Sequence, residues 1–299
     1  MDLSLIGRGL TNPSGHPVRM VLDTDTYNEI DDQFALAYAL LAQDAMCCEA
    51  VYAAPFHNER SDGPGDGMRK SLEEIERVCT ALGMRPRDGI FSGSERWLAS
   101  ADDVVDSPAV DDLIERSKRE GLLYVVAIGA PTNVAAALNK DPTLKERIVV
   151  VWLGGHPLRW HITDEFNCRQ DKHASRVLFD SGVPHVMVPC ANVAQALTTT
   201  RAEVHEALEG QGAIGDYLCQ IYDDYVDTSI GRSKVIWDIS AVAWLINANW
   251  FTTRITPSPI LTDDDRWQRD ERRHPIREVL ALSRDAIYHD LFSRVRRLS

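Results

Sequence analysis

Residues 18–41 read VRMVLDTDTYNEIDDQFALAYALL and pass from an apolar run, through a group of acids, into a second apolar run. The first run, Val18–Leu22, has the composition of a buried strand. The second, Asp32–Leu41, has the apolar spacing of a helix. This segment therefore predicts a strand that leads through one acidic turn into a helix.

The same alternation continues along the chain. Further Val- and Ile-rich runs predict strands at Ala50–Ala54, Leu123–Ile128, Ile148–Leu153 and His185–Val188. Helical patterns lie between them at Gly67–Leu82, Val110–Arg119, Asn133–Leu138 and Lys172–Phe179. This order predicts an α/β fold with an open, mainly parallel, Rossmann-like sheet flanked by helices.

The second half of the chain has a different pattern. Beyond about residue 195 it predicts helices at Arg201–Leu208, Gly215–Tyr225, Asp238–Asn249 and Arg284–Arg297. The charged segment Thr262–His274 predicts a solvated surface loop, and the Gly-rich residues 61–68, SDGPGDGM, predict a mobile loop. Because neither a linker nor a repeat divides the chain, we expect one domain over residues 1–299.

Composition limits the classes of partner. The 299 residues, 44% of them hydrophobic, can bury one large core. A formal charge of −13 argues against nucleic acid or an anionic membrane as the main partner. The six cysteines lack the spacing of a zinc site or a disulfide framework, and no apolar run approaches the roughly 20 residues of a membrane helix. We therefore expect a cytoplasmic protein that binds a small molecule.

The acidic turn after the first strand predicts a metal site. It holds Asp23, Asp25, Glu29, Asp31 and Asp32, and carboxylates this close repel one another unless a cation joins them. Helix capping explains one or two acids near the helix start, but not the pair at the strand end. Oxygen ligands without Cys or His favour calcium or magnesium over zinc.

Other motifs follow the predicted strands. They are APFHNER at residues 54–60, LYVVAIGAPTNVAAAL at 123–138, DEFNCRQD at 164–171 and VIWDISAVAWL at 235–245. The carboxyl ends of parallel strands share one edge of a sheet, so polar residues in these motifs should gather there.

In this order the motifs resemble those of the inosine-uridine-preferring nucleoside hydrolases, which are calcium-dependent N-ribohydrolases. The resemblance implies hydrolysis of the N-glycosidic bond of a ribonucleoside or related N-riboside to ribose and free base. The implied Ca²⁺ ligands are Asp25, Asp32, the main-chain carbonyl of Ile128, and Asp238. Asp31 matches the general base that activates water, and Asp23 matches a partner behind the ligands.

The resemblance also implies how substrate binds. Asn58, Glu165 and Asn167 match residues that hold the sugar. Trp237 stands where family members often have a His that assists the departing base, and an indole can stack on a base but cannot donate an acid proton. The candidates for another acid are His57, His156, His161, Asp164, Tyr222 and Tyr225.

The chain departs from the family pattern in a further place, and other functions stay open. The gap between DTD and DD is two residues longer, which enlarges the loop around Tyr27–Glu29. One alternative is a haloacid-dehalogenase-like phosphatase, whose motif also starts DxD and which uses magnesium and an aspartyl nucleophile. Another is a nucleoside-binding protein without turnover. By analogy with the family, we expect a homo-oligomer, either a dimer or a tetramer.

Overall fold

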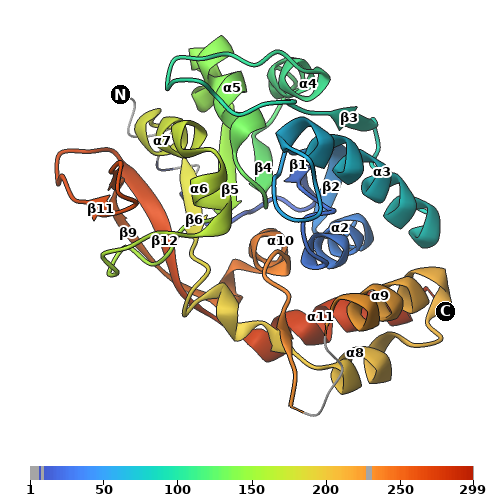
Figure 1. Ribbon diagram of the computed structural model, residues 1–299. Helices are drawn as coiled ribbons and strands as arrows, with labels where there is room; N and C mark the ends of the chain where they lie inside the picture. The colour runs from blue at the N-terminus through green and yellow to red at the C-terminus, as the bar shows by residue number, and fades with distance from the viewer. Residues whose placement is uncertain (1–6, 8–9, 227–230, 299) are drawn as a thin grey trace.

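The computed structural model describes residue 7, residues 10–226 and residues 231–298 (Figure 1). The remaining ends of the predicted 1–299 domain, residues 1–6 and 299, lie outside that description. At the centre is an eight-stranded sheet of order β3-β2-β1-β4-β5-β6-β12-β9. Its strands are β1 Val18–Thr24, β2 Met46–Ala53, β3 Ile90–Ser92, β4 Leu123–Ala127, β5 Ile148–Leu153, β6 His185–Val188, β9 Phe251–Pro257 and β12 Pro275–Leu282. Neighbours are parallel except for the pair β12 and β9.

Helices cover both faces of this sheet (Figure 1). They are α2 Asp31–Leu41, α3 Pro64–Leu82, α4 Pro108–Ser117, α5 Thr132–Lys140, α6 Phe166–Gln170, α7 Lys172–Asp180, α8 Arg201–Leu208, α9 Gly212–Tyr225, α10 Ile239–Ile246 and α11 Arg284–Arg296. Short pieces complete the chain: β7 Thr198–Thr199, β8 Lys234–Val235, β10 Ile260–Leu261, β11 Trp267–Gln268, and the 3₁₀ turns Pro142–Glu146, Ala194–Ala196 and Ala248–Trp250. Among the described residues, no helix has the length and apolarity to span a bilayer.

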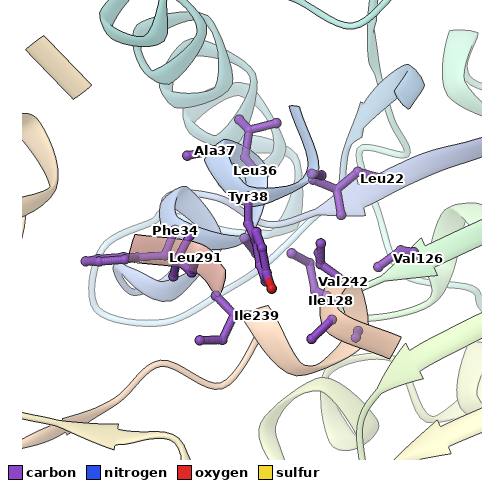
Figure 2. Close-up of a cluster of buried hydrophobic side chains, with 14 of the residues drawn as sticks. Leu22, Phe34, Leu36, Ala37, Tyr38, Val126, Ile128, Ile239, Val242 and Leu291 are labelled. Atoms are coloured by element: carbon purple, nitrogen blue, oxygen red, sulfur yellow. The ribbon is translucent and has the colours of Figure 1, made fainter. Parts of the chain in front are cut away.

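Alternate residues of each central strand enter two separate cores. In β1, Met20 and Leu22 join the core under α2, α3 and α8–α11, while Val21 joins the core under α4, α5 and α7. Figure 2 shows part of the first core, where Tyr38 of α2 lies among side chains of α10 and the sheet. Burial on both faces explains why these strands read as continuous apolar runs.

The predicted elements of the first 190 residues are confirmed, with β5 and β6 at the expected bounds. The prediction for the region after residue 195 is incomplete, because β9 and β12 extend the sheet there. Both strands carry charged residues that masked the pattern. Glu278 of β12 is fully buried and accepts hydrogen bonds from Arg254 of β9 and from the Leu158 backbone N–H. The segment Thr262–His274 is mostly loop, as predicted, but includes β11.

The Gly-rich residues 61–68 are not a mobile loop, because α3 begins within them at Pro64. A Cβ atom at Gly67 would lie 2.0 Å from the carbonyl oxygen of Phe56. The glycine therefore serves close packing of the helix against the segment after β2, a role that composition does not distinguish from flexibility.

His185 of β6 makes stability depend on pH. It is fully buried between Trp152 and Phe179, with no hydrogen-bond partner for either ring nitrogen among the described residues. Burial, with a smaller effect of His274, lowers its pKa from 6.5 to about 3. Below pH 6.5 His185 is protonated in the unfolded chain but stays neutral in the folded chain. The free energy of unfolding therefore falls as the pH drops from 6.5 towards 3.

We expect His185→Leu to remove the part of this pH dependence that His185 causes. Between pH 7 and pH 5 the wild-type free energy of unfolding should fall by about 2 kcal/mol more than that of the variant, at about 1.4 kcal/mol per pH unit. Urea unfolding at the two pH values measures the difference. Equal losses in both proteins would contradict the prediction, whatever the variant's absolute stability.

From β1 the chain adds β2 and β3 on one side of the sheet, and then returns to add β4, β5 and β6 on the other side. The switch point lies between β1 and β4. In sheets of this kind the crevice at the carboxyl ends of the strands beside such a switch point is where ligands bind. Asp23 of β1 pairs in register with Ala127 of β4, so the acidic turn and Ile128 leave the sheet side by side.

Candidate active site

Three predicted acids converge at this edge, although one of them, Asp238, is far from the other two in sequence. Asp31 and Asp32 form the first turn of α2, and Asp238 directly precedes α10. Helix α10 packs against α2, with Ile239 and Val242 turned towards it in Figure 2. One carboxylate oxygen from each aspartate lies within 4.8 Å of the others. Asp238 occupies the N-cap position but makes no capping hydrogen bond, so capping does not explain it.

Asp25 lies at the edge of this cluster. It is buried, and a Cβ atom on Gly129 would be 2.9 Å from its carboxyl carbon, which places Asp25 against the residue after Ile128. Neither carboxylate oxygen of Asp25 has a hydrogen-bond partner among the described residues. An unpaired buried carboxylate is costly, so this arrangement suits a bound cation.

Burial and mutual repulsion shift the titration of the whole cluster. Burial, then the charge of Asp31, raises the pKa of Asp32 to about 8. Burial, followed by the charges of its neighbours, also raises the pKa values of Asp25 and Asp238 well above the usual range. A cation would reverse this effect by favouring the ionised forms.

Asp23, which the family resemblance implies supports the ligands, is fully buried near the end of β1. One of its carboxylate oxygens accepts a 2.8 Å hydrogen bond from Asn133 Nδ2 of α5. Burial raises its pKa to about 7, opposed by that hydrogen bond. Its backbone carbonyl accepts from the Ile128 N–H at 2.9 Å, which couples the end of β1 to the end of β4.

The predicted sugar residues Glu165 and Asn167 reach the site from α6. The Asn167 side-chain nitrogen donates to the carbonyls of Ile128 and Leu153, at 2.9 and 3.1 Å. The Glu165 carboxylate caps α6 by accepting from the N–H groups of Asn167 and Cys168, and it also accepts from the N–H of Gly155. Both side chains are thus held in place, a structural role that the sequence did not reveal.

Asn58 does not border the cavity described below. Its side-chain nitrogen donates to the Asn28 Oδ1 at 2.7 Å, and Asn28 is the residue that faces the cavity. The enlarged loop is therefore held from outside by Asn58. Arg60 supports the same loop by stacking on Tyr27 with its guanidinium 4.2 Å from the ring centre.

Glu29 of the enlarged loop holds the ammonium group of Lys234 close to the cluster. Lys234 of β8 forms an ion pair with Glu29, and its ammonium nitrogen is 4.0 Å from Asp31 Oδ1. Asp31 Oδ2 accepts from the backbone N–H of Trp237 at 3.1 Å. Burial raises the pKa of Asp31, and the Lys234 charge opposes that increase.

A cavity of about 250 Å³ lies next to the cluster. Its walls are Asn28, Glu29, Asp31, Ile128, Leu153, His156, Asp164, Glu165, Phe166, Asn167, Cys190, Trp237 and Asp238. Carboxylates, two aromatic rings and one imidazole all contribute to this lining. A hollow of about 530 Å³ near Leu138 and Val177 is larger, but it lies away from the clustered aspartates.

This fold and site belong to the α/β enzymes that work at the carboxyl edge of a parallel sheet. A family model described as inosine-uridine preferring nucleoside hydrolase matches residues 20–288, so the chain belongs to that family. Its members are hydrolases that act on N-glycosyl compounds, and the family supports this activity over the phosphatase alternative.

Individual relatives agree with this assignment. The pyrimidine-specific ribonucleoside hydrolase RihA of Salmonella arizonae is 31% identical over 269 residues, covering 78% of this chain and 81% of the relative. The purine-preferring ribonucleoside hydrolase of Gardnerella vaginalis has a similar fold, with a TM-score of 0.75, 21% identity, and coverage of 94% of this chain and 98% of that one. The inosine-uridine preferring nucleoside hydrolase of Bacillus anthracis superposes with a TM-score of 0.71 at 15% identity, over 94% and 99% of the two chains.

Proposed function

We propose that this chain hydrolyses ribonucleosides to ribose and free base at the cavity beside Asp31, with Ca²⁺ as its metal. One observation carries the proposal. One carboxylate oxygen each of Asp31, Asp32 and Asp238 lies within 4.8 Å of the others, beside a cavity of about 250 Å³. Asp238 is far from the other two in sequence, and helix capping does not explain its position.

The donor set supports a hard cation. The proposed ligands are the carboxylates of Asp25, Asp32 and Asp238 and the carbonyl of Ile128, all of them oxygens. Cys190, the one thiol among the described residues of the cavity wall, is kept neutral because burial raises its pKa well above 9.0. When bound, Ca²⁺ would supply coordination for ribose hydroxyls and for a water molecule.

The protein's own groups then divide the work. Asp31 borders the cavity and accepts a proton from the water that attacks the ribose carbon. The remaining carboxylates stabilise the positive charge that develops on the sugar ring. Glu165 and Asn167, held by hydrogen bonds at the start of α6, border the place of the ribose hydroxyls, and Asn28, which accepts a hydrogen bond from Asn58, borders the same cavity.

Trp237 borders the cavity, and we propose that the base lies against its indole. An indole face stacks on either a purine or a pyrimidine, so Trp237 favours binding without selecting the base. We also propose a homo-oligomer, either a dimer or a tetramer, in the cytoplasm. The six cysteines, all free and five of them buried, are consistent with a reducing compartment.

A substrate panel tests the function. Calcium-loaded protein is incubated with purine and pyrimidine ribonucleosides, their 2′-deoxy analogues and a phosphomonoester, while reducing sugar and phosphate are measured. We expect ribose from the ribonucleosides and much less sugar from the deoxy analogues, because buried polar partners would stay unpaired. A chelator should stop the reaction and added Ca²⁺ should restore it. Phosphate release without ribose release would contradict the proposal.

A further inference from the structure

Departure of the base is the step for which the clustered aspartates provide no group. The electron pair of the broken C–N bond stays on the base, so a hydrogen-bond donor beside the base lowers the barrier. Trp237, next to Asp238, is proposed to stack on the base, and the N–H of a stacked indole lies in the plane of its own ring and does not point at the base. Given the proposed function, the donor must be another group in the cavity wall.

The acids in the wall outside the aspartate cluster are already engaged. Glu165 accepts hydrogen bonds from three backbone N–H groups. Asp164 pairs with Arg169 at 3.0 Å, and Glu29 pairs with Lys234. Ionised carboxylates accept hydrogen bonds and do not donate them, so none of these groups assists a base that is gaining negative charge.

Among the described residues that border the cavity, His156 is the one imidazole. The other histidine in this segment, His161, is exposed and does not border it. Within the described part of the chain, the His156 ring makes no hydrogen bond, and its Nδ1 atom is buried without a partner. Buried polar atoms normally have partners, so an unpaired ring nitrogen at a substrate cavity indicates a place for a polar group of the substrate.

The position of His156 is held firmly by its neighbours. Its backbone N–H donates to Thr163 Oγ1 at 3.0 Å, and its carbonyl accepts from Trp267 Nε1 at 2.9 Å. The ring packs against Trp160 with the two centres 5.2 Å apart. Trp267 lies in the segment after residue 260, so that segment contributes to the site by supporting this histidine.

Burial lowers the pKa of His156, opposed by the nearby charges of Glu165 and Asp164. A neutral imidazole has one N–H donor and one acceptor nitrogen. It can therefore donate to a nitrogen or carbonyl oxygen of a nucleobase without giving up its proton.

We propose that His156 binds the leaving base and donates a hydrogen bond to it as the glycosidic bond breaks. The proton stays on the imidazole. The bond's electron pair goes to the base, the hydroxyl of the attacking water goes to the sugar, and the proton taken by Asp31 passes to solvent, which protonates the free base. The expected substrates are N-ribosides whose base carries an acceptor close to the glycosidic nitrogen, which includes both purines and pyrimidines.

The test compares two classes of leaving group. His156→Phe keeps a ring but has no donor, and His156→Asn keeps a donor on a shorter side chain. Each is assayed with ribonucleosides and with 4-nitrophenyl riboside, whose nitrophenolate leaves without assistance. For His156→Phe we expect a fall in kcat of about 100-fold on ribonucleosides and little change on the nitrophenyl riboside. His156→Asn should recover part of the lost activity, and His161→Phe in the same segment should match wild type on both substrates.

The outcomes separate this inference from the proposed function. Equal losses on both substrates by a folded His156→Phe, or no loss on either, would overturn the role of His156 alone. Thermal unfolding shows whether each variant is folded, and His156→Asn carries the test if the Phe variant is not. Wild-type protein that releases ribose from neither substrate would overturn the proposed function, and the inference with it.

Discussion

Replacing Asp31 with Asn should lower kcat for ribonucleosides by about 10²–10⁴-fold while leaving the fold intact. The amide has nearly the same shape as the carboxylate but cannot accept a proton from water. The carboxylate oxygen that accepts the Trp237 N–H can be replaced by the amide oxygen, so the local structure should persist. The nearby Lys234 keeps its ion pair with Glu29.

Steady-state kinetics on the nucleoside panel measures this effect, and thermal unfolding with and without Ca²⁺ shows whether the variant still binds metal. Asp102→Asn is a matched control, because Asp102 is exposed and lies outside the cavity wall. Asp31→Asn should also lose turnover of 4-nitrophenyl riboside, because the attacking water must be activated whichever leaving group departs. Turnover close to wild type would reject Asp31 as the base.

Replacing Asp238 with Ala should remove both turnover and stabilisation by Ca²⁺. Asp238 shares the cluster with Asp31 and Asp32, and its pKa is raised by burial and by their charges. Any cation held there neutralises that repulsion. A ligand at 100 times its Kd stabilises the folded state by about 2.7 kcal/mol, which is the increment that wild type should show and the variant should lose.

Thermal or urea unfolding of the metal-free proteins, with Ca²⁺ added in steps, measures that increment. Without metal, Asp238→Ala is expected to be at least as stable as wild type, because one buried charge is gone. The two variants then divide the roles. Asp31→Asn should retain most of the Ca²⁺ effect and lose turnover, whereas Asp238→Ala should lose both. An unchanged Ca²⁺ effect in Asp238→Ala would place the metal elsewhere.

The alternation of strands and helices was predictable because each central strand is buried on both faces. Ile148–Leu153 is fully apolar for that reason, and its bounds were correct. Strands β9 and β12 were missed because their polar residues are satisfied by tertiary partners, such as Arg254 with Glu278. A charge paired across two strands looks, in sequence, the same as a charge in a solvated loop.

The glycines of residues 61–68 show a similar limit. Gly67 allows α3 to pack against the Phe56 carbonyl, whereas sequence patterns associate such glycines with mobility. His156 shows the same limit of sequence patterns at the site. It was one of several possible acids in sequence, and only the cavity wall separates it from His161.

By itself, the sequence determined the α/β class, the acidic character of the turn at Asp23–Asp32 and the family resemblance, because these follow from local patterns of burial and charge. Tertiary structure alone decided which acids meet, since Asp238 reaches Asp31 only through the packing of α10 on α2. It also decided that Asn58 supports the loop from outside the cavity and that His156 faces into it. Such contacts depend on how whole helices and strands pack, and no neighbouring residue in the chain records that packing.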